Sequence, residues 1–377
     1  MSSKYEQQIA AGLQAAYDKQ SEPAEFNVET DKWVIFSDHH RGCRDGADDF
    51  RLCEKAYNAA LGYYFEKGHR LVILGDAEEL WEASPKKVMK AYGNTLTLEA
   101  QFHKLGRYTR FFGNHDSDWQ REAAVRKYLH AIFGSDLKVH EAMRVRVKAA
   151  GIELGEVFLV HGHQGTLESD KFSWISRIAV RYGWGFIQRT FKIRSTTPAK
   201  DFDLRQEHNI AMYRWAEKKP NLVLIAGHTH RPVFASKNKL ADLQDELNEL
   251  RGKIQTAGRN APADLIERAA EIRAQIESNR VQEVSNPSGE KAIQQPRVCY
   301  FNTGCCSFSD GDVTALEIAD GAIKLVRWPD NAENYKPQVL ASADLRTVFD
   351  RLSPGAAPGF PIGSTTEPTP QPAGNIH

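Results

Sequence analysis

Short runs of apolar residues, most of them followed directly by Gly or His, recur between residues 33 and 226. Such runs are typical of buried strands, because a strand that is covered on both faces is apolar throughout. The pattern predicts five of them: Trp33–Phe36, Leu71–Leu74, Arg110–Phe112, Val157–Val160 and Leu222–Ala226. Helical stretches such as Asp49–Glu66 lie between them, and this alternation predicts a layered α/β body.

The N-terminal segment, residues 1–30, has a different periodicity. Apolar side chains recur every fourth residue from Tyr5 to Tyr17 and include Ile9 and Leu13. This spacing predicts an amphipathic helix that docks onto the body or, alternatively, onto a partner.

The body is expected to occupy residues 31–236 and to resume over residues 296–330. In the second part, Arg297–Phe301 is predicted to be a strand. Two apolar runs around Asp320-Gly321, Val313–Ile318 and Ala322–Val326, predict a β-hairpin.

Between these two parts, residues 237–282 carry leucines and isoleucines three and four residues apart, on both sides of a turn at 258–262. Heptad-like spacing on two stretches predicts a helical hairpin insertion. It is either a decoration of the body or an arm for homo-oligomerisation or for docking a partner. Residues 352–377 hold six prolines and few large apolar groups, which predicts a disordered tail.

Residues 171–194 hold six basic residues, six aromatic residues and no acidic residue. Three hypotheses fit this composition: a helical pair packed on the body, a cap over a phosphorylated ligand within residues 171–220, or peripheral contact with a membrane surface. The cap hypothesis makes Arg177, Arg181 and Trp184 candidate substrate contacts.

Charge and cysteine content narrow the classes of function. The 49 basic and 49 acidic residues balance, so no basic excess favours nucleic acid as a partner. Five cysteines, an odd number, without an apolar signal segment in residues 1–20 predict reduced thiols and a cytoplasmic protein. No apolar run approaches the roughly 20 residues of a membrane span.

The candidate chemistry lies at the ends of the predicted strands. Clusters of Asp, His and Asn follow the runs in the order Ser37-Asp38-His39-His40, Gly75-Asp76, Gly113-Asn114-His115-Asp116, His161-Gly162-His163 and Gly227-His228-Thr229-His230. Residues just past the carboxyl ends of strands share one crevice in an open sheet. Carboxylate, imidazole and amide groups are ligands for Mn, Fe and Zn, and two ions about 3.5–4 Å apart need a bridging carboxylate. No phosphate-binding loop, zinc-protease helix or nucleophile elbow competes with this interpretation.

These clusters resemble the calcineurin-like metallophosphoesterase superfamily over about residues 31–330. The resemblance implies a four-layer αββα sandwich of two mixed sheets, with helical insertions in this chain. It also implies two divalent ions, Mn or Fe and Mn, with Zn as an alternative. The implied site consists of Asp38, His40 and His230 at the first ion, Asp76 as the bridge, Asn114, His161 and His228 at the second ion, and His115 beside the leaving group, oriented by Asp116.

The predicted reaction is hydrolysis of a small phosphorylated substrate by attack of a metal-bridging hydroxide. Neighbouring residues on an extended strand point to opposite faces, so His39 is not expected to be a ligand. His163 follows His161 by two and is placed near the substrate. Arg41 either reaches the phosphate or forms a surface salt bridge.

A narrower resemblance concerns Gly75–Trp81 and His161–Gln164. These segments are similar to the branch that contains UDP-2,3-diacylglucosamine pyrophosphohydrolases, although His115 and His163 stand where that branch has Arg and Asp. The substrate class stays open between a phosphomonoester, a phosphodiester and a pyrophosphate such as a UDP-sugar lipid. Neutral charge counts against a nuclease, and the complete donor set counts against a non-catalytic scaffold.

Overall fold

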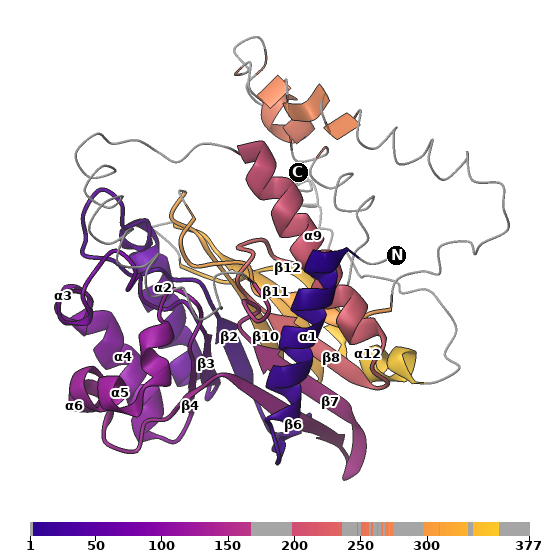
Figure 1. The fold of residues 1–377 in the computed structure, drawn as a ribbon, viewed down its shortest axis with the longest axis horizontal. Helices are drawn as coiled ribbons and strands as arrows, with labels where there is room; N and C mark the ends of the chain where they lie inside the picture. The colour runs from indigo at the N-terminus through magenta and orange to yellow at the C-terminus, as the bar shows by residue number, and fades with distance from the viewer. Residues whose placement is uncertain are drawn as a thin grey trace, which may run out of the picture.

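The computed structural model describes residues 3–166, 198–235, 297–308, 310–330 and 335–353, with isolated positions between 247 and 273. Two β-sheets lie at its centre, with helices on both sides of the pair (Figure 1). Both sheets contain parallel and antiparallel neighbours.

The larger sheet has seven strands in the order β12-β11-β10-β2-β3-β4-β5. Its parallel half, which follows the predicted βα alternation, runs from β2 to β5. The antiparallel half begins at β10, which pairs with β2. The strands are β2 (Trp33–Phe36), β3 (Arg70–Leu74), β4 (Tyr108–Phe111), β5 (Val139–His140), β10 (Val313–Ala319), β11 (Ala322–Trp328) and β12 (Gln338–Asp344).

The smaller sheet has five strands in the order β1-β6-β7-β8-β9. Strands β6 and β7 form an antiparallel hairpin. Strand β1 pairs with β6 in parallel, and β8 pairs with β7 in parallel. The strands are β1 (Ala24–Asn27), β6 (Ala142–Ala149), β7 (Ile152–Val160), β8 (Leu222–Ala226) and β9 (Tyr300–Asn302).

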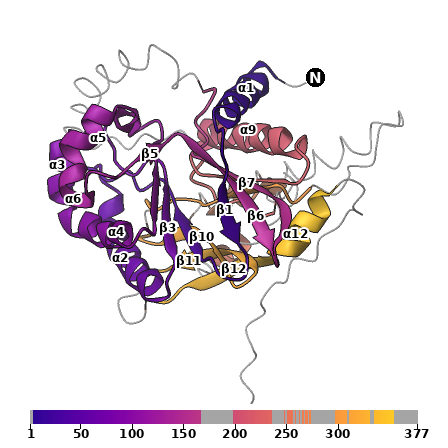
Figure 2. The same ribbon diagram turned by 90° about the horizontal axis from the view of Figure 1, so that it is seen from below.

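Helices form the two outer layers, as both ribbon views show (Figure 2). On the side of the larger sheet they are α2 (Phe50–Glu66), α3 (Pro85–Ala91), α4 (Gly93–Lys104), η1 (Ser117–Gln120), α5 (Glu122–Tyr128) and α6 (His130–Phe133). On the side of the smaller sheet they are α1 (Lys4–Asp18) and α9 (Pro198–Glu217), with α12 (Leu345–Leu352) nearby.

Strand β3 shows how one apolar run serves two layers. Leu71 and Ile73 join the core beneath α2 and α4, whereas Val72 and Leu74 join the core between the sheets. Because successive strand residues point to opposite faces, a strand buried on both sides must be apolar throughout. The predicted four-layer αββα sandwich of two mixed sheets is therefore confirmed.

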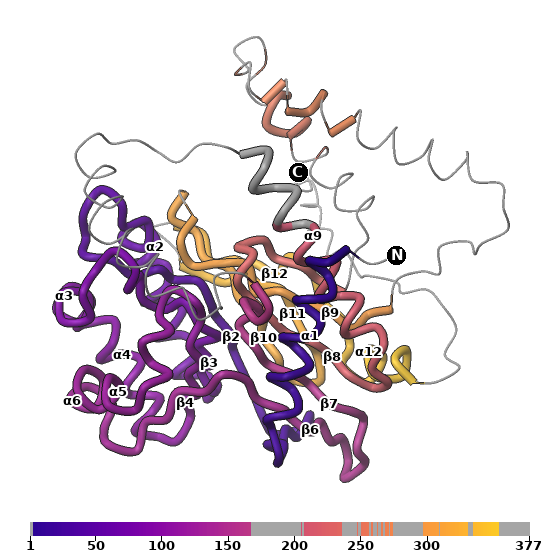
Figure 3. Tube along the Cα trace, in the orientation of Figure 1, coloured from indigo at the N-terminus to yellow at the C-terminus, as the bar shows by residue number. Residues whose placement is uncertain are grey.

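The chain trace shows where the ends of the described body lie (Figure 3). The predicted N-terminal helix is α1, with Ile9 and Leu13 buried against the smaller sheet. It ends earlier than the 1–30 segment, because Ala24–Asn27 pairs with β6 as an edge strand. Beyond residue 330, β12 and α12 also pack onto the body, and the sequence patterns did not indicate them.

Several sequence predictions fall outside the described residues. They concern the 171–194 segment, with Arg177, Arg181 and Trp184, and the tail from residue 354 onward. Of residues 237–282 only isolated positions are described, and among them Leu247, Leu250 and Ile272 form a small buried cluster. No helix in the described part of the chain is both long and apolar enough to cross a membrane.

Candidate metal centre

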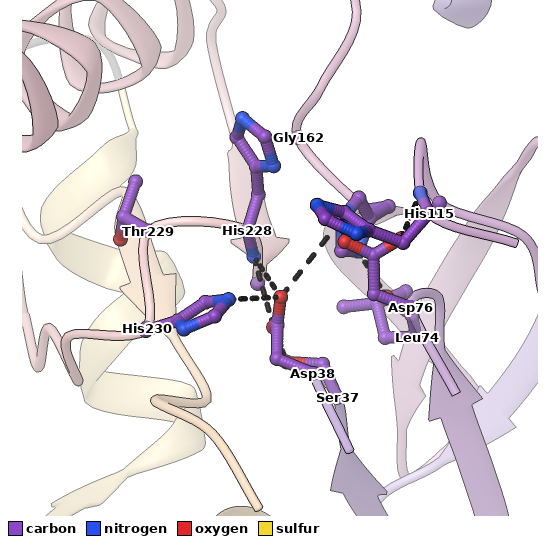
Figure 4. Close-up of polar contacts among 12 residues, drawn as sticks. Ser37, Asp38, Leu74, Asp76, His115, Gly162, His228, Thr229 and His230 are labelled. Atoms are coloured by element: carbon purple, nitrogen blue, oxygen red, sulfur yellow. Dashed lines mark hydrogen bonds and ion pairs between the residues drawn. The ribbon is translucent and has the colours of Figure 1, made fainter. Parts of the chain in front are cut away.

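Four strands from the two sheets deliver the candidate ligands to one place. Asp38 and Asp76 follow β2 and β3 of the larger sheet, whereas His161 and His228 follow β7 and β8 of the smaller sheet. Figure 4 shows the Asp38 carboxylate facing the His230 ring and the backbone nitrogen of His228, with Asp76 nearby. The strand ends thus converge as the order of the motifs predicted.

The first group of donors consists of Asp38, His40 and His230, whose ligand atoms all lie within 4.8 Å of one another. The His230 Nε2 atom is 3.3 Å from Asp38 Oδ1 and 2.9 Å from His40 Nε2. The backbone N–H of His228 donates to Asp38 Oδ2 at 2.9 Å, which fixes the carboxylate. This arrangement is suited to one divalent ion.

The second group consists of Asp76, His161 and His228, again within 4.8 Å. The Asp76 Oδ2 atom is 3.0 Å from His161 Nε2 and 3.8 Å from His40 Nε2. Asp76 also belongs to a third group, with His40 and His115. The Asp76 carboxylate therefore lies between two sets of imidazoles, which is the position of a bridging ligand between two ions.

The electrostatics of the second group favour a cation. The Nδ1 of His161 lies 2.8 Å from the Leu74 carbonyl, which can only accept, so Nδ1 carries the proton. The Nε2 of His161 faces the Asp76 carboxylate at 3.0 Å, and in the described part of the chain neither Nε2 nor Asp76 Oδ2 has another hydrogen-bond partner. Burial opposes a charged imidazole, yet Asp76 and Asp38 outweigh it and raise the pKa of His161 to about 9. A positive charge between His161 Nε2 and the two carboxylates is therefore favoured, and both this charge balance and the donor chemistry fit a bound metal ion.

Backbone hydrogen bonds join the loops that carry Asp38 and Asp76. The N–H of Asp38 donates to Gly75 at 3.1 Å, and the N–H of His40 donates to Asp76 at 2.9 Å. Asp38, His40 and Asp76 all have positive φ, between 48° and 54°. Such conformations cost free energy in residues other than glycine and tend to persist where the surroundings fix them, often at functional sites.

Two motif glycines make room for carboxylates from other motifs. A Cβ on Gly113 would lie 2.2 Å from Asp76 Oδ1, and a Cβ on Gly227 would lie 2.5 Å from Asp38 Oδ2. Both distances are far below van der Waals contact, so any larger residue would displace a candidate ligand.

His115 has a different partner from the one expected. Its Nδ1 lies 2.7 Å from Glu79 Oε2, and the same oxygen is 3.1 Å from His40 Nδ1. The Trp81 ring stacks on the His115 ring at 4.2 Å, and its indole N–H donates to the Asn114 carbonyl at 2.8 Å. Glu79 and Trp81 therefore hold the His115 imidazole. Both belong to the Gly75–Trp81 segment, but the sequence did not indicate this role.

Asp116 instead holds the backbone. Its Oδ1 accepts from the N–H of Gly113 at 2.6 Å and its Oδ2 accepts from the N–H of Ala77 at 2.9 Å. The prediction that Asp116 orients His115 is corrected accordingly, because both its oxygens serve these loops. Burial, together with the nearby charges of Asp76 and Glu78, raises the pKa of Asp116 to about 7.

Arg41 also differs from both alternatives that the sequence left open. Its side chain is fully buried and lies 2.9 Å from Glu99 Oε1, and its Nε–H donates to the Ala77 carbonyl at 3.0 Å. Glu78 and Arg110 complete this buried charge network. Arg41 therefore supports the loop after β3 from beneath and faces neither a phosphate nor solvent.

The remaining predicted residues are buried. His39 packs edge-on against Tyr57 at 4.6 Å, away from the donors, although its segment lies beyond the end of β2 and is not the extended strand from which this was predicted. His163 lies beside His161, with ring centroids 5.4 Å apart, and burial together with His161 lowers its pKa to about 3. Asn114 is buried in the loop between Gly113 and His115.

Helix α9 contributes two residues that sequence analysis did not identify, His208 and Asn209. The Oδ1 of Asn209 accepts from the Thr229 hydroxyl at 3.1 Å and from the Tyr300 hydroxyl at 2.7 Å. His208 is buried, and its ring lies 5.0 Å from the His228 ring. No local motif marks these residues, because they act through contacts with distant loops.

Comparisons with known proteins add little. No protein-family model and no curated protein matches the chain. Two solved structures of a cold-active protein tyrosine phosphatase, one of them a point mutant, align with 86–87% of this chain and 83–84% of theirs. The identities are 11% and 12% and the TM-scores are 0.28 and 0.30, values at which the likeness carries no argument.

Proposed function

We propose that this protein is a metal-dependent phosphoester hydrolase with a dinuclear centre. The observation that carries the proposal is the position of Asp76, whose carboxylate lies among His40 and His115 on one side and His161 and His228 on the other. A carboxylate shared by two donor groups is what a pair of ions about 3.5–4 Å apart requires. The resemblance of the motifs to calcineurin-like metallophosphoesterases supports the same function.

In this proposal Asp38, His40 and His230 hold one ion, Asn114, His161 and His228 hold the other, and Asp76 is shared. Bound divalent ions, Mn or Fe with Zn as an alternative, would supply the Lewis acidity that activates water and neutralises charge on the phosphoryl oxygens. His115 would donate a proton to the leaving oxygen. Glu79, 2.7 Å from His115 Nδ1, would hold that imidazole with its Nε2 directed away from the carboxylate.

The proposed substrate is a small phosphorylated molecule, since the balanced charge of the chain offers no general attraction for nucleic acid. Metal ligands recognise only the phosphoryl group, so selectivity requires groups above the centre. His163 and, within residues 171–194, Arg177, Arg181 and Trp184 are proposed for that role. The similarity of Gly75–Trp81 to the pyrophosphohydrolase branch makes a nucleotide-sugar pyrophosphate one of the substrates to test.

The test combines metal analysis with a substrate panel. The purified protein is loaded with Mn²⁺ and assayed on p-nitrophenyl phosphate, bis-p-nitrophenyl phosphate, cyclic nucleotides and UDP-sugar lipids. We expect two equivalents of bound metal and hydrolysis of at least one class, lost on chelation and restored by metal. Failure to bind metal, or activity that survives complete chelation, would overturn the proposal.

A further inference from the structure

Helix α1 packs against the loop that carries His161 with almost no space between the two backbones. A Cβ on Gly12 would lie 2.4 Å from the backbone nitrogen of Gly165, and a Cβ on Gly165 would lie 2.2 Å from the carbonyl of Gln8. Glycine at both positions therefore permits direct contact between helix and loop. On the same helix, Ile9 and Leu13 are buried in the core between helix and sheet.

A chain of hydrogen bonds continues from this contact into the candidate metal centre. The Tyr5 hydroxyl lies 2.7 Å from His208 Nδ1, and His208 Nε2 lies 2.8 Å from the carbonyl of Gly162. A carbonyl only accepts, so Nε2 carries the proton and Nδ1 of the neutral ring accepts from the Tyr5 hydroxyl. The polarity of the chain is thereby fixed from Tyr5 through His208 to Gly162.

Gly162 and His208 both contact candidate ligands. Gly162 lies between His161 and His163 and has φ +113°, so its conformation sets the direction in which the chain leaves His161. The His208 ring is 2% exposed and lies 5.0 Å from the ring of His228. One side chain from α9 therefore supports both imidazoles of the second donor group.

We infer that Tyr5 and His208 are positioning residues of the metal centre, and that α1 is a working part of that centre. The inference rests on the proposed metal-binding function and extends it to residues that no sequence motif marks. Tyr5 fixes the orientation of the His208 ring, and His208 fixes the Gly162 carbonyl and limits rotation of the His228 ring. Loss of either contact should leave His161 and His228 with more freedom and lower the affinity for the second ion.

Four single variants of the full chain separate positioning from general stability. Tyr5→Phe removes only the hydroxyl, because the ring and the apolar face of α1 remain. Tyr17→Phe is the matched control, since it removes a hydroxyl from the same helix, on a ring that packs against Phe158 and Trp215 rather than at the centre. His208→Gln retains an N–H donor near the Gly162 carbonyl, whereas His208→Leu removes it.

Two readouts are taken on each variant, Mn²⁺ affinity by calorimetric titration and the thermal midpoint with and without Mn²⁺. Tyr5→Phe and His208→Leu should weaken Mn²⁺ binding by about tenfold or more, the lower end of the usual effect of residues behind metal ligands. The thermal midpoint of metal-free Tyr5→Phe should stay close to that of metal-free Tyr17→Phe. The shift on adding Mn²⁺ should shrink in both, and His208→Gln should recover most of it.

The outcomes are distinguishable. Wild-type protein that binds no Mn²⁺ would overturn the proposed function itself. Wild-type protein that binds Mn²⁺, with Tyr5→Phe and His208→Leu binding equally well, would overturn this inference alone. A midpoint lowered equally with and without Mn²⁺ would also overturn it, because the residues would then only stabilise the fold.

Discussion

Glu79 offers a sharp test of the candidate site, because it occupies the role that sequence analysis assigned to Asp116. The perturbation is Glu79→Gln, which keeps the size of the side chain and removes its charge. Glu79 Oε2 lies 2.7 Å from His115 Nδ1, and the side chain is 16% exposed. Burial alone would raise the pKa of Glu79, but His115 and His40 lower it to about 2, so the carboxylate is charged.

The magnitude follows from these contacts. Two unit charges about 4 Å apart interact by about 4 kcal/mol at an effective dielectric constant of about 20. A general acid contributes about 10²–10⁴-fold to a rate. We therefore expect Glu79→Gln to lower the rate by about 10²–10³-fold, or about 3–4 kcal/mol, for a substrate with a poor leaving group.

The assay follows hydrolysis by the Mn-loaded protein of aryl phosphates that differ in the basicity of the leaving phenol. A good leaving group needs little protonation, so the loss in Glu79→Gln should shrink as the leaving phenol becomes more acidic. Metal content is measured in parallel, because Glu79 also lies 3.1 Å from His40 Nδ1. Asp116→Asn is the matched variant, and any loss it causes should be the same for all leaving groups.

Two results would contradict the proposed role of Glu79. A loss in Glu79→Gln that is independent of the leaving group, with both metals retained, would mean that Glu79 does not act through proton donation by His115. A loss in Asp116→Asn that grows with leaving-group basicity would return the orienting role to Asp116, against the contacts of its two oxygens.

Three further predictions concern metal binding and stability. Asp76→Ala should lose at least one metal by elemental analysis, and two fully retained ions would exclude it as the bridge. Gly113→Ala should weaken metal binding while the protein folds, because the new Cβ would lie 2.2 Å from Asp76 Oδ1; unchanged affinity would contradict this steric argument. Burial lowers the pKa of His69 from 6.5 to about 4, so its stabilising contribution is fully present above pH 6.5 and is lost as the pH falls toward 4. Between about pH 7 and pH 5, the unfolding free energy of His69→Phe should therefore fall by about 2 kcal/mol less than that of the wild type. An equal fall in the wild type and the variant would contradict this prediction.

Much of the architecture could be predicted because it depends on short-range patterns. Runs such as Trp33–Phe36 and Leu222–Ala226 are apolar at every position, and both occur as strands with those bounds. Their polar ends then placed the donors, since parallel strands end at a common edge. By contrast, β12 is an edge strand with three exposed residues followed by half-buried ones, and its apolar stretch is limited to residues 339–341.

The partners of the residues that follow the candidate ligands in the chain could not be predicted from local sequence patterns. Asp116 follows His115 in the chain and looked like its partner, yet the fold turns its carboxylate toward Gly113 and Ala77. Arg41 follows His40, and the sequence could not show that Glu99, from α4, would meet it in the core. In both cases the partner is chosen by the approach of a loop distant in sequence, which spacing does not encode.

The division of donors between the sheets links the centre to the packing of the whole body. Asp38, His40, Asp76 and His115 follow strands of the larger sheet, and His161, His228 and His230 follow strands of the smaller one. Neither sheet alone supplies the whole second donor group. Asp76 follows a strand of the larger sheet, whereas His161 and His228 follow strands of the smaller sheet. The second donor group therefore depends on the apolar core that holds the two sheets together, to which Val72, Leu74 and Leu159 contribute. A bound ion would bind only the packed arrangement, so its binding free energy would add to the stability of the assembled sandwich.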